Sequence, residues 1–417
     1  MIQKDVVVIG GGAAGLMAAI TAARAGAKTV IIEHMERVGK KILATGNGKC
    51  NYTNALQGVS YYRGENPAFV MPVLEQFGLE KTLIFFKQIG IYPKCRNGYY
   101  YPSSEQAASV LDVLRMEADY QKVETNTSCE IKNIKKQGEK FIIDTNRGNF
   151  LAKSIVFTPG LLASPKTGSD GSAFRYIEKL GHHFIDIVPA LVGLQGKQAF
   201  FKVLAGIRAE STIKLYIEND MICEEQGELQ LTDYGISGIP VFQISRFATR
   251  ALHKSKKVHV IIDFMPRMEV SELCTHLTER FGIQSHDKTA GEALIGFFNK
   301  KLIEVLLKES GIDLHLPAKK VGKHQLQQLC RTVKEFRVDI IGSKSFDQAQ
   351  ACAGGVDTAE IDARTMESKL VRGVYFAGEV VDIDGTCGGY NLQWAWSSGY
   401  VAGMHASVRM NDRKTLK

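Results

Sequence analysis

Three glycines, Gly10, Gly12 and Gly15, stand between a β-branched run, Asp5–Ile9, and an alanine-rich helical stretch, 16–25. At this spacing, Gly10 permits a tight turn and Gly12 lets another group approach the backbone closely. Gly15 lets the helix pack against the strand. The unpaired N–H groups at the helix N-terminus attract negative charge. The pattern therefore predicts a loop that holds the diphosphate of a dinucleotide.

An acidic residue supports this interpretation. Glu33 ends a second strand-like run, 28–32, which completes a strand–helix–strand unit of the Rossmann type. A carboxylate at this position accepts hydrogen bonds from the two ribose hydroxyls and repels a 2′-phosphate. The unit therefore predicts FAD or NAD, and Ala13 and Ala14 of the loop belong to the same predicted site.

Two later stretches favour FAD over NAD. The first, 39–51, is rich in glycines, amides and lysines, which suit phosphates and a flat ring. The second follows a buried strand, 374–377, where Glu379 can hold the hydroxyls of a ribityl chain. The glycine-rich loop 385–389 then opens a helix at 391. Its N-terminus would face the flavin edge where negative charge develops on reduction.

The order of the remaining elements predicts an α/β protein whose first domain is interrupted by an insertion. Alternating strand-like runs follow residue 191, a helical region comes next, and a strand over 334–341 precedes the return to the first domain. Within the helical region we expect helices over 270–281 and 291–308, and Asp170 should cap an earlier helix over 171–180. The predicted domains are an FAD-binding domain (1–191 and 345–417), a β-rich substrate domain (192–265 and 332–344) and a helical subdomain (266–331).

Composition limits the class of protein. The charges are interspersed, 52 basic against 44 acidic residues, so the net charge of +8 indicates a solvated surface without a nucleic-acid partner. No segment has the roughly 18 uninterrupted apolar residues of a membrane span, and no signal peptide is evident. The eight cysteines form no CxxC pair, which favours a reducing cytoplasm and argues against a metal or iron–sulfur site. The basic tail, 409–417, should be frayed.

Several motifs together resemble a known family, the HI0933-like bacterial FAD-dependent oxidoreductases, which includes BaiN-type bile-acid reductases and aminoacetone oxidases. The motifs extend over nearly the whole chain: GGGAAG (10–15), KKILATGNGKCNYTN (40–54), SPKTGSDG (164–171), GELQLTDYGISG (227–238), FDQAQACAGGVDTAEID (346–362), MESKLVRGVYFAGEVVDIDG (366–385) and CGGYNLQWAWSSGYVAG (387–403). The resemblance implies that the insertion is a β-barrel-like substrate domain with a small helical subdomain. Lys49 stands where family members often carry arginine, which keeps the charge and loses the planar fork.

The resemblance also implies a set of residues that bind FAD. They are Gly10, Gly12, Ala13, Ala14, Gly15, Glu33, Lys41, Gly46, Asn47, Gly48, Gly378, Glu379, Asn391, Leu392 and Gln393. The complete predicted cofactor site adds Lys40, Cys50, Cys129, Gly160 and Gly389. No metal site is predicted.

The expected reaction is hydride transfer between flavin N5 and a small organic substrate. We expect reduction of an activated C=C bond such as a steroid enone, with NAD(P)H as a transient donor because no second GxGxxG follows a strand. The alternatives are an amine oxidase that uses O₂ and a flavin-containing RNA- or partner-binding protein. No side chain is an evident acid or base; Tyr100, Cys387 and Tyr390 are the candidates. The cysteines near the flavin loops can also be small residues that fit beside the ring.

Overall fold

The computed structural model describes residues 1–282 and 287–408 of the chain. The chain forms two compact units. Unit 1 comprises Met1–Pro189 and Phe346–Lys417, and unit 2 comprises Ala190–Ser345. The predicted basic tail, 409–417, lies outside the described residues.

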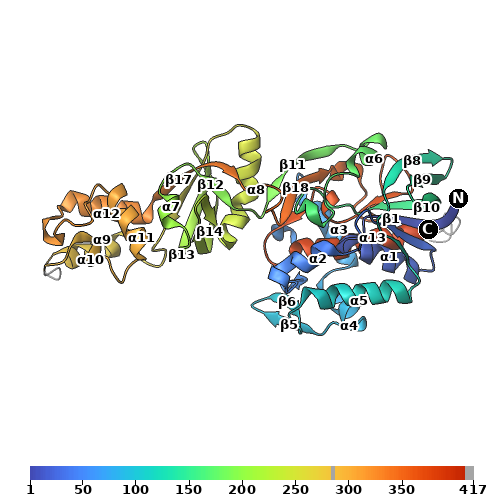
Figure 1. Cartoon of the computed structure of the whole chain (residues 1–417), viewed down its shortest axis with the longest axis horizontal. Helices are drawn as coiled ribbons and strands as arrows, with labels where there is room; N and C mark the ends of the chain where they lie inside the picture. Colours follow the sequence, from blue (N-terminus) through green and yellow to red (C-terminus); the bar gives the residue numbers. More distant parts are fainter. Residues whose placement is uncertain (283–286, 409–417) are drawn as a thin grey trace. The chain divides into compact units, whose positions relative to one another are not determined.

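A seven-stranded sheet forms the centre of unit 1 (Figure 1). Its strands in spatial order are β7 (Glu124–Asn126), β2 (Thr29–Ile32), β1 (Ile2–Ile9), β10 (Gly148–Phe157), β9 (Lys140–Thr145) and β8 (Ile131–Gln137). The seventh, β19 (Val374–Phe376), pairs in parallel with the end of β10. Strands β7, β2, β1 and β10 are also mutually parallel, whereas β9 is antiparallel to β10, and β8 is antiparallel to β9. Because β1 is covered on both faces, Val6, Val7 and Val8 are fully buried, which explains the unbroken β-branched run.

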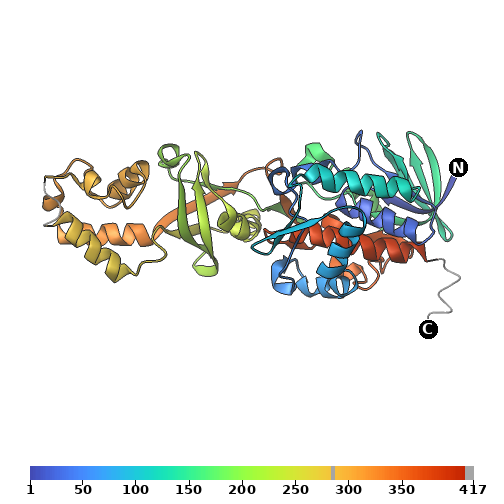
Figure 2. The same cartoon turned by 90° about the horizontal axis from the view of Figure 1, so that it is seen from below.

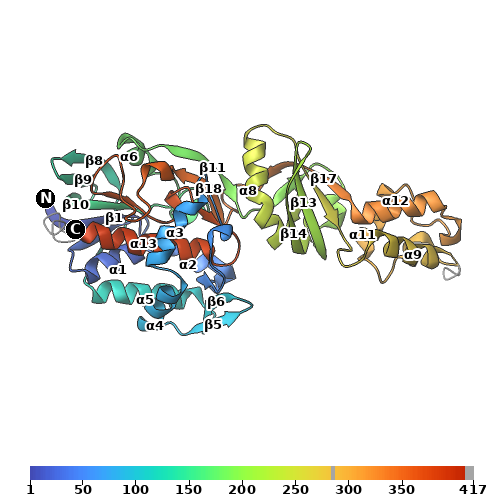
Figure 3. The same ribbon diagram turned by 180° about the vertical axis from the view of Figure 1, so that it is seen from behind.

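Two helices from opposite ends of the chain pack together against this sheet. They are α1 (Ala13–Arg24) and α13 (Tyr390–Ser407), and Figures 2 and 3 show them side by side. A Cβ at Gly399 would lie 2.5 Å from the carbonyl oxygen of Ala14, and one at Gly403 would lie 2.3 Å from that of Ala18. The small residues of α13 therefore let the two backbones approach closely.

Smaller elements complete unit 1. Its other helices are α2 (Lys40–Ala44), α3 (Met71–Gln76), α4 (Leu79–Gln88), α5 (Ala107–Tyr120) and α6 (Phe174–Lys179). Its minor sheets pair β3 (Thr53–Asn54) with β6 (Tyr99–Pro102) and β5 (Pro93–Arg96), β4 (Tyr62–Arg63) with β20 (Asp384–Gly385), and β11 (Phe184–Ala190) with β18 (Ala351–Val356).

The predicted cap at Asp170 was wrong. Helix α6 begins at Phe174, and its N-cap residue is Ala173. The Asp170 carboxylate instead accepts a hydrogen bond from the backbone N–H of Ser172, 3.0 Å away. The side chain therefore closes a local turn before the helix starts.

Unit 2 is built around a closed antiparallel barrel. Its strands are β12 (Leu194–Gly196), β15 (Gly235–Ser237), β14 (Asp220–Leu231), β13 (Arg208–Ile217), β16 (Val258–Asp263) and β17 (Phe336–Ser343). The barrel part of unit 2 also contains helix α7 (Phe201–Leu204) and helix α8 (Ile239–His253). The helical part contains α9 (Val270–Phe281), α10 (Ala290–Ala293), α11 (Lys300–Glu309) and α12 (Lys323–Lys334). One continuous set of buried apolar side chains joins the barrel to these helices.

Two element predictions in unit 2 need correction. The single helix expected over 291–308 is two helices, α10 and α11. The helix is interrupted there because Gly296 adopts a positive φ of 98°, and because the Asn299 side chain caps α11 by accepting a hydrogen bond from the Lys301 N–H. The strand expected from residue 334 begins at Phe336, because α12 continues to Lys334.

Within residues 1–282 and 287–408, no helix combines the length and the apolar character that a membrane crossing requires.

Candidate cofactor site

A cavity of about 350 Å³ opens at the carboxyl ends of the parallel strands of unit 1. The loops after β1, β2, β10 and β19 supply Gly10, Glu33, Thr158 and Glu379 to its lining. Loops at this edge of a parallel sheet are the usual place for a nucleotide cofactor, because they converge where the connecting helices begin.

The glycine loop has the geometry that a diphosphate requires. A Cβ at Gly12 would have no atom within 4 Å, so this position faces open space in the cavity. Helix α1 begins there without a side-chain cap and without an acidic residue in its first turn. A Cβ at Gly15 would lie only 1.9 Å from the Gly10 carbonyl oxygen, so Gly15 serves close packing. The cradle therefore fits a diphosphate held by backbone N–H groups.

Glu33 is a buried carboxylate, 7% exposed, at the end of β2. It accepts hydrogen bonds from the backbone N–H groups of Gly11 (2.7 Å) and Met35 (2.8 Å). The backbone carbonyl of Glu33 accepts from the N–H of Cys129 at 2.9 Å, which fixes the strand end. An ionised carboxylate has about four acceptor positions, so capacity remains for ribose hydroxyls.

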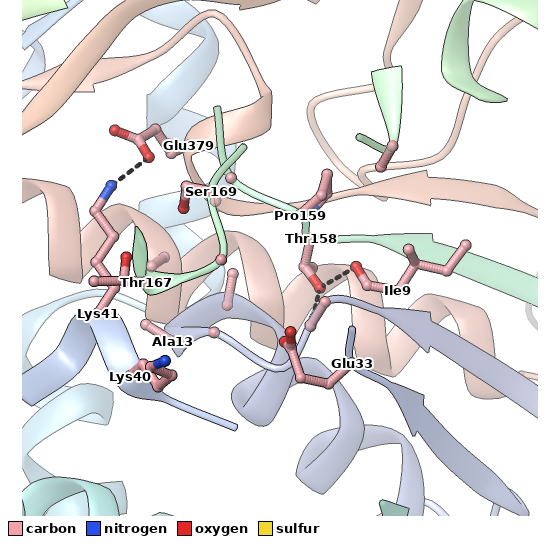
Figure 4. Close-up of a pocket in the computed structure, with 18 of the residues that line it drawn as sticks. Ile9, Ala13, Glu33, Lys40, Lys41, Thr158, Pro159, Thr167, Ser169 and Glu379 are labelled. Carbon is pink, nitrogen blue, oxygen red and sulfur yellow. Dashed lines mark hydrogen bonds and ion pairs between the residues drawn. The ribbon is translucent and has the colours of Figure 1, made fainter. Parts of the chain in front are cut away.

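An ion pair lies elsewhere in the same cavity, apart from Glu33 in the view of Figure 4. Lys41 Nζ is 2.8 Å from Glu379 Oε2, and Glu379 Oε1 accepts from the backbone N–H of Cys352 at 3.0 Å. From the sequence, Lys41 was expected to contact phosphates and Glu379 to contact ribityl hydroxyls, each independently of the other. In the structure the two side chains neutralise and orient each other.

Helix α13 brings its first turn to the cavity through Asn391 and Leu392. It has no side-chain cap and no acidic residue in that turn. Gly389, the residue before it, does not line the cavity. A Cβ there would lie 2.9 Å from Asn51 Oδ1 and from the Thr53 carbonyl oxygen, so this glycine serves packing against the 51–53 loop.

Gln393 has a structural role that its position in the motif did not reveal. Its side chain is fully buried and lies outside the cavity lining. Its amide nitrogen donates to Thr82 Oγ1 at 2.9 Å and Ser397 Oγ at 2.8 Å, and its amide oxygen accepts from Thr53. These bonds tie α13 to α4 and β3 and leave no polar atom of the side chain for a cofactor.

The cavity gathers most of the predicted cofactor residues. Those that line it are Gly10, Gly12, Ala13, Ala14, Glu33, Lys40, Lys41, Cys129, Gly160, Gly378, Glu379, Asn391 and Leu392. Those that do not are Gly15, Gly46, Asn47, Gly48, Cys50, Gly389 and Gln393. Burial raises the pKa of the Cys50 thiol to about 12, so it stays protonated.

Part of the lining was missed by sequence reasoning. The missed residues include Thr158 and Pro159 after β10, and eight residues between positions 167 and 176: Thr167, Gly168, Ser169, Asp170, Ser172, Ala173, Arg175 and Tyr176. Thr158 Oγ1 donates to the Ile9 and Gly10 carbonyl oxygens (Figure 4), which holds the glycine loop in place. The Thr-Pro-Gly turn after the strand, and the SPKTGSDG motif, were visible signals of this contribution.

None of the three candidate catalytic side chains, Tyr100, Cys387 and Tyr390, lines the cavity. Tyr390 is buried and stacks on Tyr61 at 4.6 Å between ring centroids, and burial raises its pKa. Tyr100 pairs with Cys95 across the β5–β6 hairpin. The assignment of a proton donor therefore receives no support from this cavity.

Comparisons with known proteins agree with this fold. The family model described as HI0933-like protein Rossmann domain matches residues 4–405. A 3-dehydro-bile acid delta(4,6)-reductase of Clostridium scindens is 44% identical over 96% of this chain and 98% of its own length. A ribosomal RNA dihydrouridine synthase of Escherichia coli is 29% identical over 96% of this chain and 97% of its own length.

Among solved structures, the apo Sdh1 complex of Mycobacterium smegmatis has a TM-score of 0.50 at 12% identity, covering 100% of this chain and 69% of that one. This likeness concerns the fold alone. The family match and the 44% identity extend over nearly the whole chain. The chain therefore belongs to the HI0933-like family of FAD-dependent oxidoreductases.

Proposed function

We propose that this protein reduces a C=C bond conjugated with a carbonyl group, with a steroid-like enone as substrate. The observation that carries the proposal is the 44% identity, over 96% of the chain, with a protein named a 3-dehydro-bile acid delta(4,6)-reductase. An identity at this level over the full length makes a shared reaction class the simplest inference.

Different residues of the cavity would hold different parts of FAD. Gly12 and the α1 N-terminus would hold the FAD diphosphate, Glu33 the ribose, and the first turn of α13 would lie toward the flavin. When bound and reduced, FAD would supply a hydride to the electron-poor carbon of the enone, and a proton would complete the neighbouring carbon. We propose NAD(P)H as the electron donor. Because the sequence has no second GxGxxG fingerprint after a strand, the nucleotide would bind only transiently.

A second candidate substrate is a uracil ring in RNA. The relative named a ribosomal RNA dihydrouridine synthase is 29% identical over 96% of the chain. Dihydrouridine is uridine with a reduced C5–C6 bond, and that bond is also conjugated with a carbonyl. Both names therefore point to the same bond type in different molecules.

The test is anaerobic reoxidation of the reduced holoprotein. Photoreduced protein is mixed with a 3-oxo-4-ene steroid, with its saturated 3-oxo analogue, or with a uridine-containing oligonucleotide, while the flavin band is followed. We expect the steroid enone to reoxidise the flavin and the saturated ketone to leave it reduced. If only the oligonucleotide reoxidises the flavin, the substrate is RNA and not a steroid. If neither compound oxidises the reduced flavin, but amines reduce the oxidised flavin and O₂ then reoxidises it, the oxidase alternative replaces the proposal.

In the same instrument, NADH and NADPH are mixed with oxidised protein. Rapid bleaching of the flavin by either supports the proposed donor, and absence of bleaching by both removes it.

A further inference from the structure

A second cavity of unit 1, about 200 Å³ in volume, lies at the β5–β6 hairpin and is not part of the cofactor cavity. Basic and aromatic side chains dominate its lining, which consists of Lys49, Arg96, Asn97, Tyr99, Tyr101 and Glu105. Positive charges beside flat rings are suited to a ligand that carries an anionic group on an apolar or aromatic body.

The hairpin geometry explains why these residues share one face. Asn97 and Gly98 both have positive φ values, 50° and 86°, as a two-residue hairpin turn requires. The register pairs Arg96 with Tyr99, and the pair two residues further along is Lys94 with Tyr101. Cross-strand partners share a face, and residues two apart along a strand do so too. The two cations and the two tyrosines are therefore on one side of the hairpin.

A single carboxylate organises the cations. Glu105 lies 3.2 Å from Lys49 Nζ and 2.5 Å from both Lys94 Nζ and Arg96 Nη2. Hydrogen bonds from Lys94 and Lys49 hold the pKa of Glu105 at about 2, so it is ionised at neutral pH. Three positive charges on one negative charge leave a net charge of +2.

The backbone at Glu105 supports a positioning role for this carboxylate. Its φ is +52°, in the left-handed region that a glutamate seldom adopts, and its N–H donates to the Pro102 carbonyl at 2.8 Å. The three cations nevertheless stay accessible, because the side chains of Lys49, Lys94 and Arg96 are 50%, 38% and 55% exposed. They retain donors that can meet a ligand from solvent.

The loop before α13 connects this cavity to the cofactor cavity. A Cβ at Gly388 would lie 3.0 Å from Cε1 of Tyr99, so the Tyr99 ring packs directly on this loop. The Asn54 amide fixes the same loop by donating to the Gly388 carbonyl at 2.9 Å. Three residues after Gly388 the chain reaches Asn391, which lines the cofactor cavity. Tyr99 and the predicted flavin position therefore border one loop.

We infer that the Lys49–Lys94–Arg96 cluster is a recognition site for the oxyanion of a ligand that reacts at the flavin. The oxyanion is a carboxylate or a phosphate, and the body of the ligand packs on Tyr99 and Tyr101. The inference rests on the proposed function for the reaction of that ligand. Two sources offer this chemistry: the side-chain carboxylate of a steroid acid and a phosphate of the nicotinamide donor.

The experiment compares the FAD-loaded wild-type protein with the double variant Lys94→Gln/Arg96→Gln. Dissociation constants are measured for four probes. For a 3-oxo-4-ene steroid carboxylic acid and its methyl ester they come from the flavin absorbance change of the oxidised protein. For NADH and NADPH they come from the dependence of the anaerobic bleaching rate on nucleotide concentration. Arg147→Gln, an exposed arginine elsewhere in unit 1, is the matched control for a lost charge. Melting curves and FAD occupancy show whether each variant is folded.

We expect one of the charged probes to bind the double variant about tenfold more weakly than the wild type, with no change in Arg147→Gln. Weakened binding of the acid alone, with the ester unaffected, assigns the cluster to the substrate. Weakened binding of NADH, or of NADPH alone, assigns it to the donor. If the wild type and the folded double variant bind the acid and both nucleotides equally, the inference is wrong.

The ester separates this inference from the proposed function. It keeps the enone and has no charge for the cluster to hold, so its reoxidation of reduced flavin depends on the reaction alone. If the ester does not reoxidise the reduced flavin, the proposed reaction is wrong. If the double variant nevertheless binds NADPH more weakly than the wild type, the oxyanion site is retained.

Discussion

Glu33 combines two tasks in one buried carboxylate. It holds the glycine loop and the following turn through the N–H groups of Gly11 and Met35, and it borders the cavity where the ribose is expected. Because it binds the backbone and is also proposed to bind the ribose, replacing it should disturb the loop in addition to removing the ribose hydrogen bonds.

We predict that Glu33→Arg weakens FAD binding by roughly 1.5–3 kcal/mol, or about 10- to 100-fold, through loss of charge-assisted hydrogen bonds. Quenching of flavin fluorescence during titration of the apoprotein measures the change. Glu33→Gln keeps one acceptor oxygen and should lose less. An unchanged dissociation constant for Glu33→Arg would show that the ribose lies elsewhere.

At the scale of an element, the start of helix α1 has two glycine positions, Gly12 just before it and Gly15 in its first turn, that look alike in sequence and differ in structure. Gly12 faces open space, whereas Gly15 is in contact with the Gly10 carbonyl. Gly12→Ala should therefore fold normally and bind FAD at least about tenfold more weakly, because the methyl group occupies space required by the diphosphate. Gly15→Ala should lower the melting temperature even without FAD, because helix and loop must separate.

Thermal melting of the apoproteins and FAD titration distinguish the two effects. Equal losses of apoprotein stability in both variants would contradict the division of roles.

The N-terminus of α13 gives an electrostatic prediction. The first turn has no acidic residue, and Leu392 lines the cavity. Leu392→Asp should lower the flavin midpoint potential by tens of millivolts, because a carboxylate opposes the anionic reduced flavin; about 1.4 kcal/mol corresponds to roughly 30 mV for two electrons. Leu392→Asn is the control, because asparagine has nearly the same shape as aspartate and no charge. Dye-equilibration titrations at checked FAD occupancy measure both potentials, and matching values would place the flavin away from this turn.

For the whole molecule, every residue of the cofactor cavity belongs to unit 1. The two chain segments next to the junctions of unit 2 include β11 and β18, which are neighbours in one sheet. A variant in which a short Gly-Ser linker replaces Ala190–Ser345 should therefore fold and retain FAD, while losing enone reduction. Circular dichroism, FAD titration and the steroid assay test the three parts. A soluble but cofactor-free product would show that unit 2 contributes to FAD binding.

The sequence by itself determined the features that depend on neighbours along the chain. The strand–glycine loop–helix unit ending at Glu33 is local: Gly10 makes the turn, Gly12 leaves open space and Gly15 contacts Gly10, all within about 30 residues. The helix 270–281 and the strand runs of the barrel were predicted because periodic apolar residues encode them directly. The family motifs then implied that the insertion is a β-barrel-like domain and implied the set of FAD-binding residues.

Only the tertiary structure decided which side chains meet. The pair Lys41–Glu379 joins residues 338 positions apart, and no local pattern specifies such a partner. Gln393 and Gly389 belong to the cofactor motif, but both have structural roles. Gly389 packs against the 51–53 loop, and Gln393 forms a hydrogen bond with Thr82 of α4. The face of a strand is set by its register with a neighbour, which places Tyr99 and Tyr101 with the basic cavity and leaves Tyr100 on the other face. Spacing fixes the local backbone, whereas contact requires the whole chain to be packed.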